Sequence, residues 1–125
     1  MDISNLSPQE RIVEINHPGT GEPLGVKVTL LSLLDERMKK IKRRLTDNRL
    51  MLDQKGKKFK AADIEENENA LLFEAITSWV WEGEANWKGE KPEFNRKNVY
   101  EVLRQEWFKN QLMEAVGDEQ SFFTN

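Results

Sequence analysis

Two strand-like stretches near the N-terminus constrain the fold most strongly. Arg11–Asn16 (RIVEIN) is short and β-branched, and residues 25–31 (GVKVTLL) alternate apolar and polar side chains, as in a half-buried strand. The connecting stretch HPGTGEPLG holds three glycines, the last of them Gly25, and two prolines, so we predict a β-hairpin with a long turn over residues 9–31. Because an isolated hairpin is only marginally stable in water, helices of this chain or another chain must cover it.

A basic helix is predicted after the hairpin, with Ser32 as its N-cap and an end before Gly56. Its apolar residues recur at helical spacing and form one stripe: Leu34, Met38, Ile41, Leu45 and Leu52. The other faces carry Arg37, Lys39, Lys40, Lys42, Arg43, Arg44 and Arg49. The glycine-containing stretch QKGKKFK that follows is predicted to be a loop or hinge.

An acidic helix is predicted next, beginning at Asp63 with Glu66 at the spacing of a capping box. Its apolar face comprises Ile64, Leu71, Leu72, Ala75, Ile76, Trp79 and Val80. Its outer face carries Glu65, Glu66, Glu68 and Glu74. A basic and an acidic helix in succession suggest an antiparallel pair, in which each exposed ion pair adds at most about 1 kcal/mol. The apolar stripes must therefore supply the stability.

Two further helices are predicted after a loop from which Trp87 folds back onto the core. Asn95 caps a short helix that places Val99, Val102 and Leu103 inward, and a second helix runs from about Glu106 to Val116, where Gly117 ends it. We thus predict one α+β domain over residues 1–125, mainly helical with a small N-terminal β-hairpin. The hairpin covers residues 9–31, the helical part residues 32–117 and the C-terminal tail residues 118–125.

The residues favour no catalytic, metal or cofactor site. The chain lacks cysteine, which excludes disulfides and thiolate metal sites, and its single histidine, His17, precedes a proline in the predicted turn. The glycines of that turn match neither phosphate-binding pattern. The acidic run Glu65, Glu66 and Glu68 is typical of a solvated helix face. We therefore predict a protein that is not an enzyme and needs no cofactor.

The composition favours a protein that stays in the cell that makes it. The formal net charge is -3 and no apolar run approaches the roughly 20 residues that cross a bilayer, so we expect no membrane partner. The N-terminus lacks the features of a signal peptide. The absence of cysteine suits a reducing cytoplasm.

The basic helix is the one candidate for nucleic-acid binding. Its basic residues run from Arg37 to Arg49 and continue with Lys55, Lys57, Lys58 and Lys60, so that residues 37–60 could bind phosphates through counterion release. The adjoining acidic segment can neutralise it, and no base-reading motif accompanies it. A small nucleic-acid-binding regulator is therefore the less favoured alternative.

Aromatic residues indicate a protein–protein interface. The chain has four tryptophans, and exposed tryptophans are frequent at interaction hot spots. Trp107 and Phe108 lie about 100° apart on a helix and cannot share one narrow stripe, so core and interface are equally favoured for them. Trp79 is assigned to the core. The predicted partner-binding residues are Trp81, Trp107, Phe108, Gln111, Leu112, Phe122 and Phe123.

The sequence resembles the tail assembly chaperones of long-tailed (siphovirus) phages and prophages, from about residue 9 to residue 123. The first block is HPGTGEPLGVKVTLLSLLDERMKKIKRR, and the second spans GEKPEFNRKNVYEVL and the aromatic residues that follow. Family members usually have Ser or Thr where this chain has Asn95, which is also a good helix cap. The matching residues are Pro18, Gly21, Glu22, Pro23, Gly25, Trp81, Gly83, Phe94, Asn95, Asn98, Trp107, Gln111, Asp118 and Phe122.

The resemblance implies a protein that coats the tape measure protein, keeps that long helical rod soluble and helps recruit tail tube subunits. Such a protein acts in the host cytoplasm, tends to self-associate and is absent from the mature virion. An exposed hairpin edge would also favour self-association. A structural tail or connector protein that remains in the virion is a further alternative.

Overall fold

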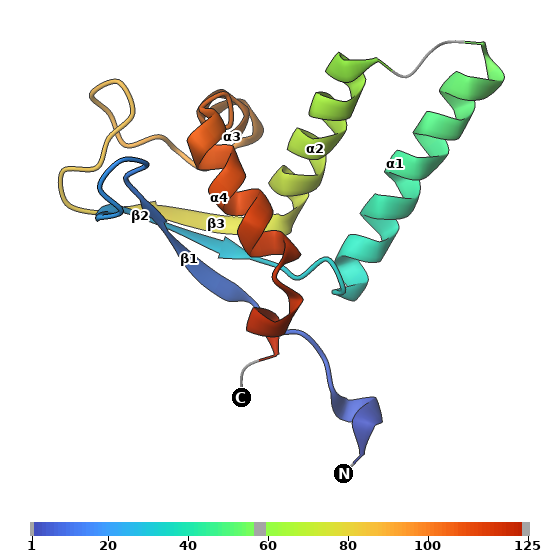
Figure 1. Cartoon of the computed structure of the whole chain (residues 1–125), viewed down its shortest axis with the longest axis horizontal. Helices are drawn as coiled ribbons and strands as arrows, with labels where there is room; N and C mark the ends of the chain where they lie inside the picture. The colour runs from blue at the N-terminus through green and yellow to red at the C-terminus, as the bar shows by residue number, and fades with distance from the viewer. Residues whose placement is uncertain (1, 57–59, 124–125) are drawn as a thin grey trace.

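The computed structural model describes residues 2–56 and 60–123, apart from the side chain of Leu52. Its strands are β1 (Arg11–Asn16), β2 (Pro23–Leu30) and β3 (Ile76–Trp81), and its helices are α1 (Glu36–Gln54), α2 (Ala61–Ala75), α3 (Arg96–Val102) and α4 (Glu106–Gly117). Short 3-10 turns occupy Ile3–Asn5 and Glu119–Phe122. In Figure 1, α2, α3 and α4 lie over one side of the sheet, and α1 stands beside α2.

The sheet is antiparallel in the order β1-β2-β3, so β2 is its central strand. The register pairs Ile15 with Val26 and Val28 with Trp79, and all four side chains are buried beneath the helices. On the other face Ile12 is 66% exposed. The predicted alternation in β2 is therefore confirmed, and the helices of the chain itself cover the hairpin.

The third strand corrects the sequence prediction. Residues 76–81 (ITSWVW) were expected to extend the acidic helix, but α2 ends at Ala75 and β3 begins at the next residue. Half of the chain is helical, so the expectations of a mainly helical fold and of a β-structure confined to residues 9–31 are wrong. Three β-branched residues and two tryptophans favour a strand, and the free edge of β2 offers its backbone groups partners.

The register of β3 also changes the geometry of its tryptophans. On a helix, Trp79 and Trp81 would point about 200° apart. On a strand they share one face, since side chains alternate with a period of two, and their ring centroids are 5.5 Å apart. Trp79 is 8% exposed and its indole N–H donates to the carbonyl oxygen of Pro92 at 3.0 Å. Its predicted place in the core is confirmed.

Three predicted helix boundaries are confirmed. The side chain of Asn95 accepts a hydrogen bond from the backbone N–H of Asn98 at 2.8 Å and caps α3. Helix α1 ends at Gln54, before Gly56, and α4 ends at Gly117. The predicted inward residues of α3 are also buried.

Two predicted helix starts are wrong by a few residues. The N-cap of α1 is Asp35, whose carboxylate accepts from the N–H of Arg37 at 2.9 Å, whereas Ser32 is buried in the preceding turn. Helix α2 begins earlier than Asp63, which lies in its first turn and accepts from the N–H of Lys60 at 2.8 Å. A carboxylate can accept hydrogen bonds from the free N–H groups at a helix start both from the residue before the helix and from its first turn.

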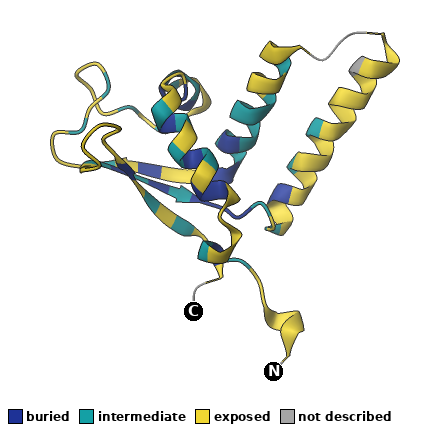
Figure 2. Cartoon of the chain, viewed as in Figure 1, coloured by how far each residue is buried: buried dark blue, intermediate teal, exposed yellow. Residues whose placement is uncertain are grey.

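Helices α1 and α2 stand side by side and form an arm (Figure 1). Among the ion pairs of the described residues, Arg44–Glu74 at 3.8 Å joins α1 to α2. Met38 at the base of α1 is buried, whereas the outer part of the arm is largely exposed (Figure 2). The predicted loop or hinge QKGKKFK falls partly on residues 57–59, which lie outside the described residues.

None of the helices in the described part of the chain is both long enough and apolar enough to cross a membrane.

The buried side chains of the sheet and the helices form one continuous cluster. Helix α4 contributes Phe108, Leu112, Ala115 and Val116 to it.

Candidate partner-binding site

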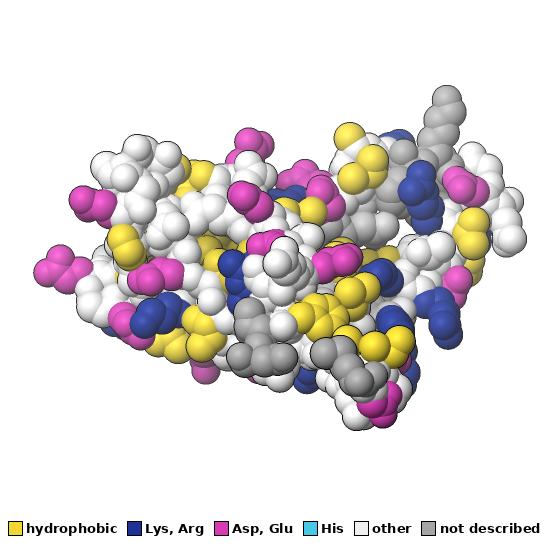
Figure 3. Space-filling model, turned by 60° about the horizontal axis from the view of Figure 1, so that its bottom comes forward, with side chains coloured by type: hydrophobic (Ala, Val, Ile, Leu, Met, Phe, Trp, Pro, Cys, Tyr) yellow, Lys and Arg dark blue, Asp and Glu magenta, His cyan; other side chains and the backbone are white. Residues whose placement is uncertain are grey.

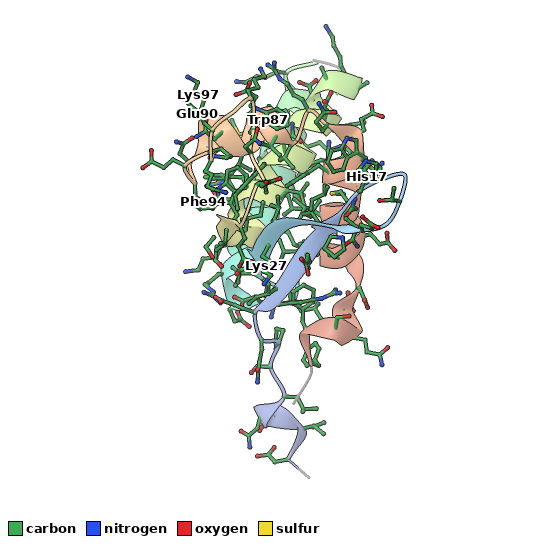
Figure 4. The ribbon with its side chains drawn as sticks, turned by 90° about the vertical axis from the view of Figure 1, so that its left-hand side faces the viewer. His17, Lys27, Trp87, Glu90, Phe94 and Lys97 are labelled. Carbon is green, nitrogen blue, oxygen red and sulfur yellow. The ribbon has the colours of Figure 1, made fainter. Side chains whose placement is uncertain are left out.

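A small apolar cleft lies where the sheet, the loop of residues 82–95 and the start of α4 meet. Its volume is about 220 Å³. We call it the aromatic cleft; its walls are Leu24, Val26, Trp81, Ala85, Asn86, Trp87, Trp107 and Phe108. Figure 4 looks onto this end of the molecule, with Trp87 and Glu90 on the loop and His17 in the hairpin turn.

The aromatic rings of the cleft continue into the core. Trp81 stacks on Phe108 at 6.5 Å between centroids with an interplanar angle of 14°, and Trp107 meets the same ring edge-on at 5.9 Å. Trp79, which is buried in the core, packs edge-on against Trp81. Each such contact adds about 0.5–1.5 kcal/mol beyond the burial of area. The walls are therefore formed before any partner arrives, which lowers the entropic cost of binding.

A single lysine holds the loop that forms one wall of the cleft. The Lys91 ammonium donates to three backbone carbonyl oxygens: those of Trp81 at 3.0 Å, Gly83 at 2.9 Å and Ala85 at 3.0 Å. These bonds use all three of its donors. Lys91 thus fixes the conformation of the loop and is not available to a ligand.

Gly25 lies where β2 passes the start of the loop. Its carbonyl oxygen accepts from the N–H of Glu82 at 2.7 Å. Its φ is +87°, and a Cβ here would lie 2.8 Å from the carbonyl oxygen of Glu82. Only glycine fits this close approach without strain.

The loop is also attached to α3. Lys88 lies 5.9 Å from the ring centroid of Trp87, and its ammonium donates to the carboxylate of Glu101 at 2.9 Å. The hydrogen bond from Lys88 is the main cause of the lowered pKa of Glu101. The outer wall of the aromatic cleft is therefore tied both to the sheet and to a helix.

Comparisons of the chain with protein-family models, with curated proteins and with solved structures find no match.

The structure brings together three of the seven predicted partner-binding residues. Trp81, Trp107 and Phe108 all line the aromatic cleft. Phe108 is 3% exposed and is mainly a core residue, whereas Trp81 and Trp107 are half-buried. Core and interface were equally favoured for Trp107 and Phe108. In this conformation Phe108 is the core residue and Trp107 the more exposed one. Partner binding itself stays a prediction.

Gln111 lies on α4 beside the edge of β1. Its side-chain amide donates to the carbonyl oxygen of Asn16 and accepts from the N–H of Asn16, both at 2.8 Å. The amide thus takes the place of a neighbouring strand at this residue. The hairpin edge that was expected to be exposed is occupied here by Gln111, and on its other side β2 pairs with β3.

The remaining predicted residues lie away from the aromatic cleft. Leu112 and Phe122 are buried in the core, at 0% and 1% exposure, so they could touch a partner only if the C-terminal segment moved. The N–H of Gln9 donates to the carbonyl oxygen of Phe122 at 2.7 Å, which places the tail beside the start of β1. Phe123 is 37% exposed in a groove there with Leu6. The tail therefore marks the opposite end of the sheet from the cleft.

Sequence reasoning missed four walls of the cleft: Leu24, Val26, Ala85 and Asn86. It did place Trp87 against the core, and Trp87 does pack against the core cluster. The sequence signal that could have placed Trp87 in the cleft is its position between two glycines, Gly83 and Gly89. Both glycines have positive φ. Only the chain reversal that these turns permit brings Trp87 over β2 and α4.

The other candidate sites have simpler explanations. His17 accepts from the N–H groups of Gly19 at 3.0 Å and Thr20 at 3.2 Å, so it stabilises the turn in which it was predicted to lie. Among the described residues, no group of three or more His, Cys, Asp or Glu could hold a metal ion. Glu65 and Glu66 line an open groove between α2 and α3 that also contains Lys97 and Arg104.

Proposed function

We propose that this protein is a tail assembly chaperone that binds the tape measure protein through the aromatic cleft and helps recruit tail tube subunits. The observation that carries the proposal is the meeting of Trp81, Trp107 and Phe108 in one preformed apolar site. The resemblance over residues 9–123 supports the choice of partner. The chaperone would act in the host cytoplasm, without catalysis or a cofactor, and leave before the virion is complete.

The size of the cleft supports a protein partner. Sites for small molecules usually measure about 300–1,000 Å³, whereas the aromatic cleft measures about 220 Å³. A site of this size suits one apolar side chain that anchors a longer segment. An amphipathic helix laid over the mouth of the cleft would present such an anchor.

Co-expression with the tape measure protein of the same genome tests the proposal. We expect the wild-type chain to raise the soluble fraction of that protein severalfold, and Trp107→Ala to remove most of this effect. Leu50→Ala is the matched control, because Leu50 is exposed on α1, away from the cleft. A tape measure protein that is no more soluble with the wild-type chain than without it would contradict the function.

Nucleic-acid binding keeps one observation in its favour. The side chains of Arg37 and Lys39 are 60% and 54% exposed, and both line a shallow groove on α1 with Lys40 and Arg43. A titration of the chain with duplex DNA and with RNA over a range of salt concentrations decides between the two functions. Absence of binding at low salt removes the alternative.

Two further measurements separate the remaining alternatives. A connector protein would be found by mass spectrometry in purified virions, whereas a chaperone would be absent. Self-association predicts a mass above that of one chain by light scattering at high concentration, and a monomeric mass throughout would contradict it.

A further inference from the structure

Three backbone carbonyl oxygens converge on one point beside the loop of residues 82–95. They belong to Trp81, Gly83 and Ala85, and each accepts a hydrogen bond from the Lys91 ammonium, at 3.0, 2.9 and 3.0 Å. The negative ends of three carbonyl dipoles therefore surround a single cation. Because like partial charges repel one another, this arrangement of the backbone depends on a positive charge at its centre.

The lysine is held by neutral groups alone. The loop has several glutamates, and Figure 3 shows acidic side chains at the left-hand end of the molecule, where the loop and the hairpin turn lie. Among the ion pairs of the described residues, however, none involves Lys91. An ammonium has three donors and no acceptor. The three carbonyl oxygens thus match it in number and position, without a counter-charge.

The backbone on both sides of Lys91 is fixed, so the ammonium reaches the carbonyl oxygens from a defined position. The carbonyl oxygen of the preceding residue, Glu90, accepts from the backbone N–H of Trp87 at 2.7 Å. The carbonyl oxygen of the following residue, Pro92, accepts from the indole N–H of Trp79 at 3.0 Å. Lys91 therefore joins the returning part of the loop to its outgoing part and to the end of β3.

We infer that these three carbonyl oxygens form a binding site for a primary ammonium ion, which Lys91 occupies from within the chain. Two of the three residues, Trp81 and Ala85, are also walls of the aromatic cleft, so the occupied site holds those walls in place. Lys91 is thus a positioning residue for the cleft. The inference goes beyond the proposed function, because it concerns the free chain and holds whether or not the cleft binds the tape measure protein.

Lys91→Met tests whether the ammonium holds the loop, because it keeps most of the side chain but removes the charge and the three donors. The amides of Ala85 and Trp87 are hydrogen-bonded within the loop. We expect both to exchange hydrogen about tenfold faster in this variant, since hydrogen bonds from a charged group are among the stronger ones. Amides of α4 should keep their exchange rates, because Lys91 is exposed and outside the core cluster.

Lys88→Met is the matched control, since it removes the same charge from the same loop. Its ion pair with Glu101 is exposed, so its loss should change the two loop amides by less than about threefold. Equal effects of Lys88→Met and Lys91→Met would overturn the inference. Faster exchange spread equally over the loop, the sheet and α4 would show that Lys91 supports the whole fold, and would contradict its role in positioning the loop.

Lys91→Ala tests the ammonium site itself, because it leaves the three carbonyl oxygens without their cation. Propylammonium replaces the atoms that this substitution removes, whereas tetramethylammonium at the same concentration supplies the charge without an N–H donor. We expect propylammonium to slow the exchange of the two loop amides severalfold in Lys91→Ala and to leave the wild type unchanged. Tetramethylammonium should have no such effect. Rescue by both ions alike, or by neither, would overturn the assignment of the site.

These measurements use the free chain, so they are independent of the co-expression experiment. Failure of co-expression with the rescue intact would contradict the proposed partner and leave this inference standing. Solubilisation of the tape measure protein together with an absence of rescue would do the reverse.

Discussion

Helices α1 and α4 are both amphipathic, yet the structure uses them differently. Helix α1 has 19 residues and buries Met38 at its base, and Ile41 and Leu45 on the same stripe are half-buried. Helix α4 has only 12 residues but buries four side chains and contacts β1. The difference lies in what each helix faces: α4 lies on the sheet, whereas α1 lies mainly beside another helix in a projecting arm (Figure 2).

The spacing of apolar residues in the sequence therefore shows that one face of a helix is apolar. It does not show how much of that face the rest of the protein covers. Residues at matching stripe positions of α1 and α4 should therefore differ sharply in their contribution to stability. Substitutions on the two helices and on the edge of the sheet test that difference.

Phe108→Ala in α4 should lower the free energy of unfolding by about 3–5 kcal/mol, because it removes a buried ring and leaves a cavity. Its counterpart on the apolar stripe of α1 is Leu45→Ala, where a half-buried side chain should cost only about 1 kcal/mol. Urea denaturation followed by circular dichroism measures both. Similar losses for the two variants would break the comparison.

Met38→Ala tests the base of the arm. Met38 is fully buried, so its truncation should cost about 2–3 kcal/mol. Hydrogen exchange should show the loss of protection first in α1, because α1 contacts mainly α2, whereas α4 contacts the sheet. Equal loosening of α4 would show that the arm and the sheet unfold as one unit.

Gln111→Ala removes the two hydrogen bonds to Asn16 and leaves the edge of β1 open at that residue. We expect a loss of about 1–2 kcal/mol in the same denaturation experiment. Gln120→Ala is the control, since Gln120 is exposed in the C-terminal 3-10 turn. A loss no larger than that of the control would show that Gln111 adds nothing to the closure of the edge.

Asp35→Ala removes the N-cap of α1 and should cost about 1 kcal/mol near neutral pH, whereas Asp35→Asn keeps the cap. The side chain of Arg37 donates to the Asp35 carboxylate at 3.0 and 2.9 Å and thereby lowers its pKa. The contribution of the charge is therefore full above the pKa of an unfolded aspartate, about 3.9, and is lost as the pH falls through the lower folded value.

The pH dependence is read from denaturation curves between neutral pH and pH 3. The difference between wild type and Asp35→Asn should begin to shrink toward the acidic end of this range as the carboxylate of the wild type starts to be protonated. A constant difference between them over the whole range would contradict the role of the charge.

The sequence predicted the elements whose pattern is local. The alternation of Val26, Val28 and Leu30, the cap at Asn95 and the stop at Gly117 all depend on nearby residues, and the structure confirms them. The strand Ile76–Trp81 was missed because its apolar residues also fit a helical face. Pairing with β2, about 50 residues away in the chain, decides between the two.

The candidate site was predicted only in part for the same reason. Trp81, Trp107 and Phe108 were identified by their residue types, but their meeting depends on the strand and on the loop that Lys91 holds. Burial of Phe122 depends on the tail folding back beside β1. Neither contact leaves a periodic trace in the sequence.

The indole N–H signals of the four tryptophans in a ¹H–¹⁵N spectrum show whether a partner binds in the aromatic cleft. The full chain is titrated with overlapping peptides that span the tape measure protein. We predict that at least one peptide shifts the signals of Trp81, Trp87 and Trp107, with a smaller change for Trp79, which stays bonded to Pro92. Binding peptides that shift amide signals of α1 and leave these three indole signals unchanged would contradict the assignment of the aromatic cleft as the partner-binding site.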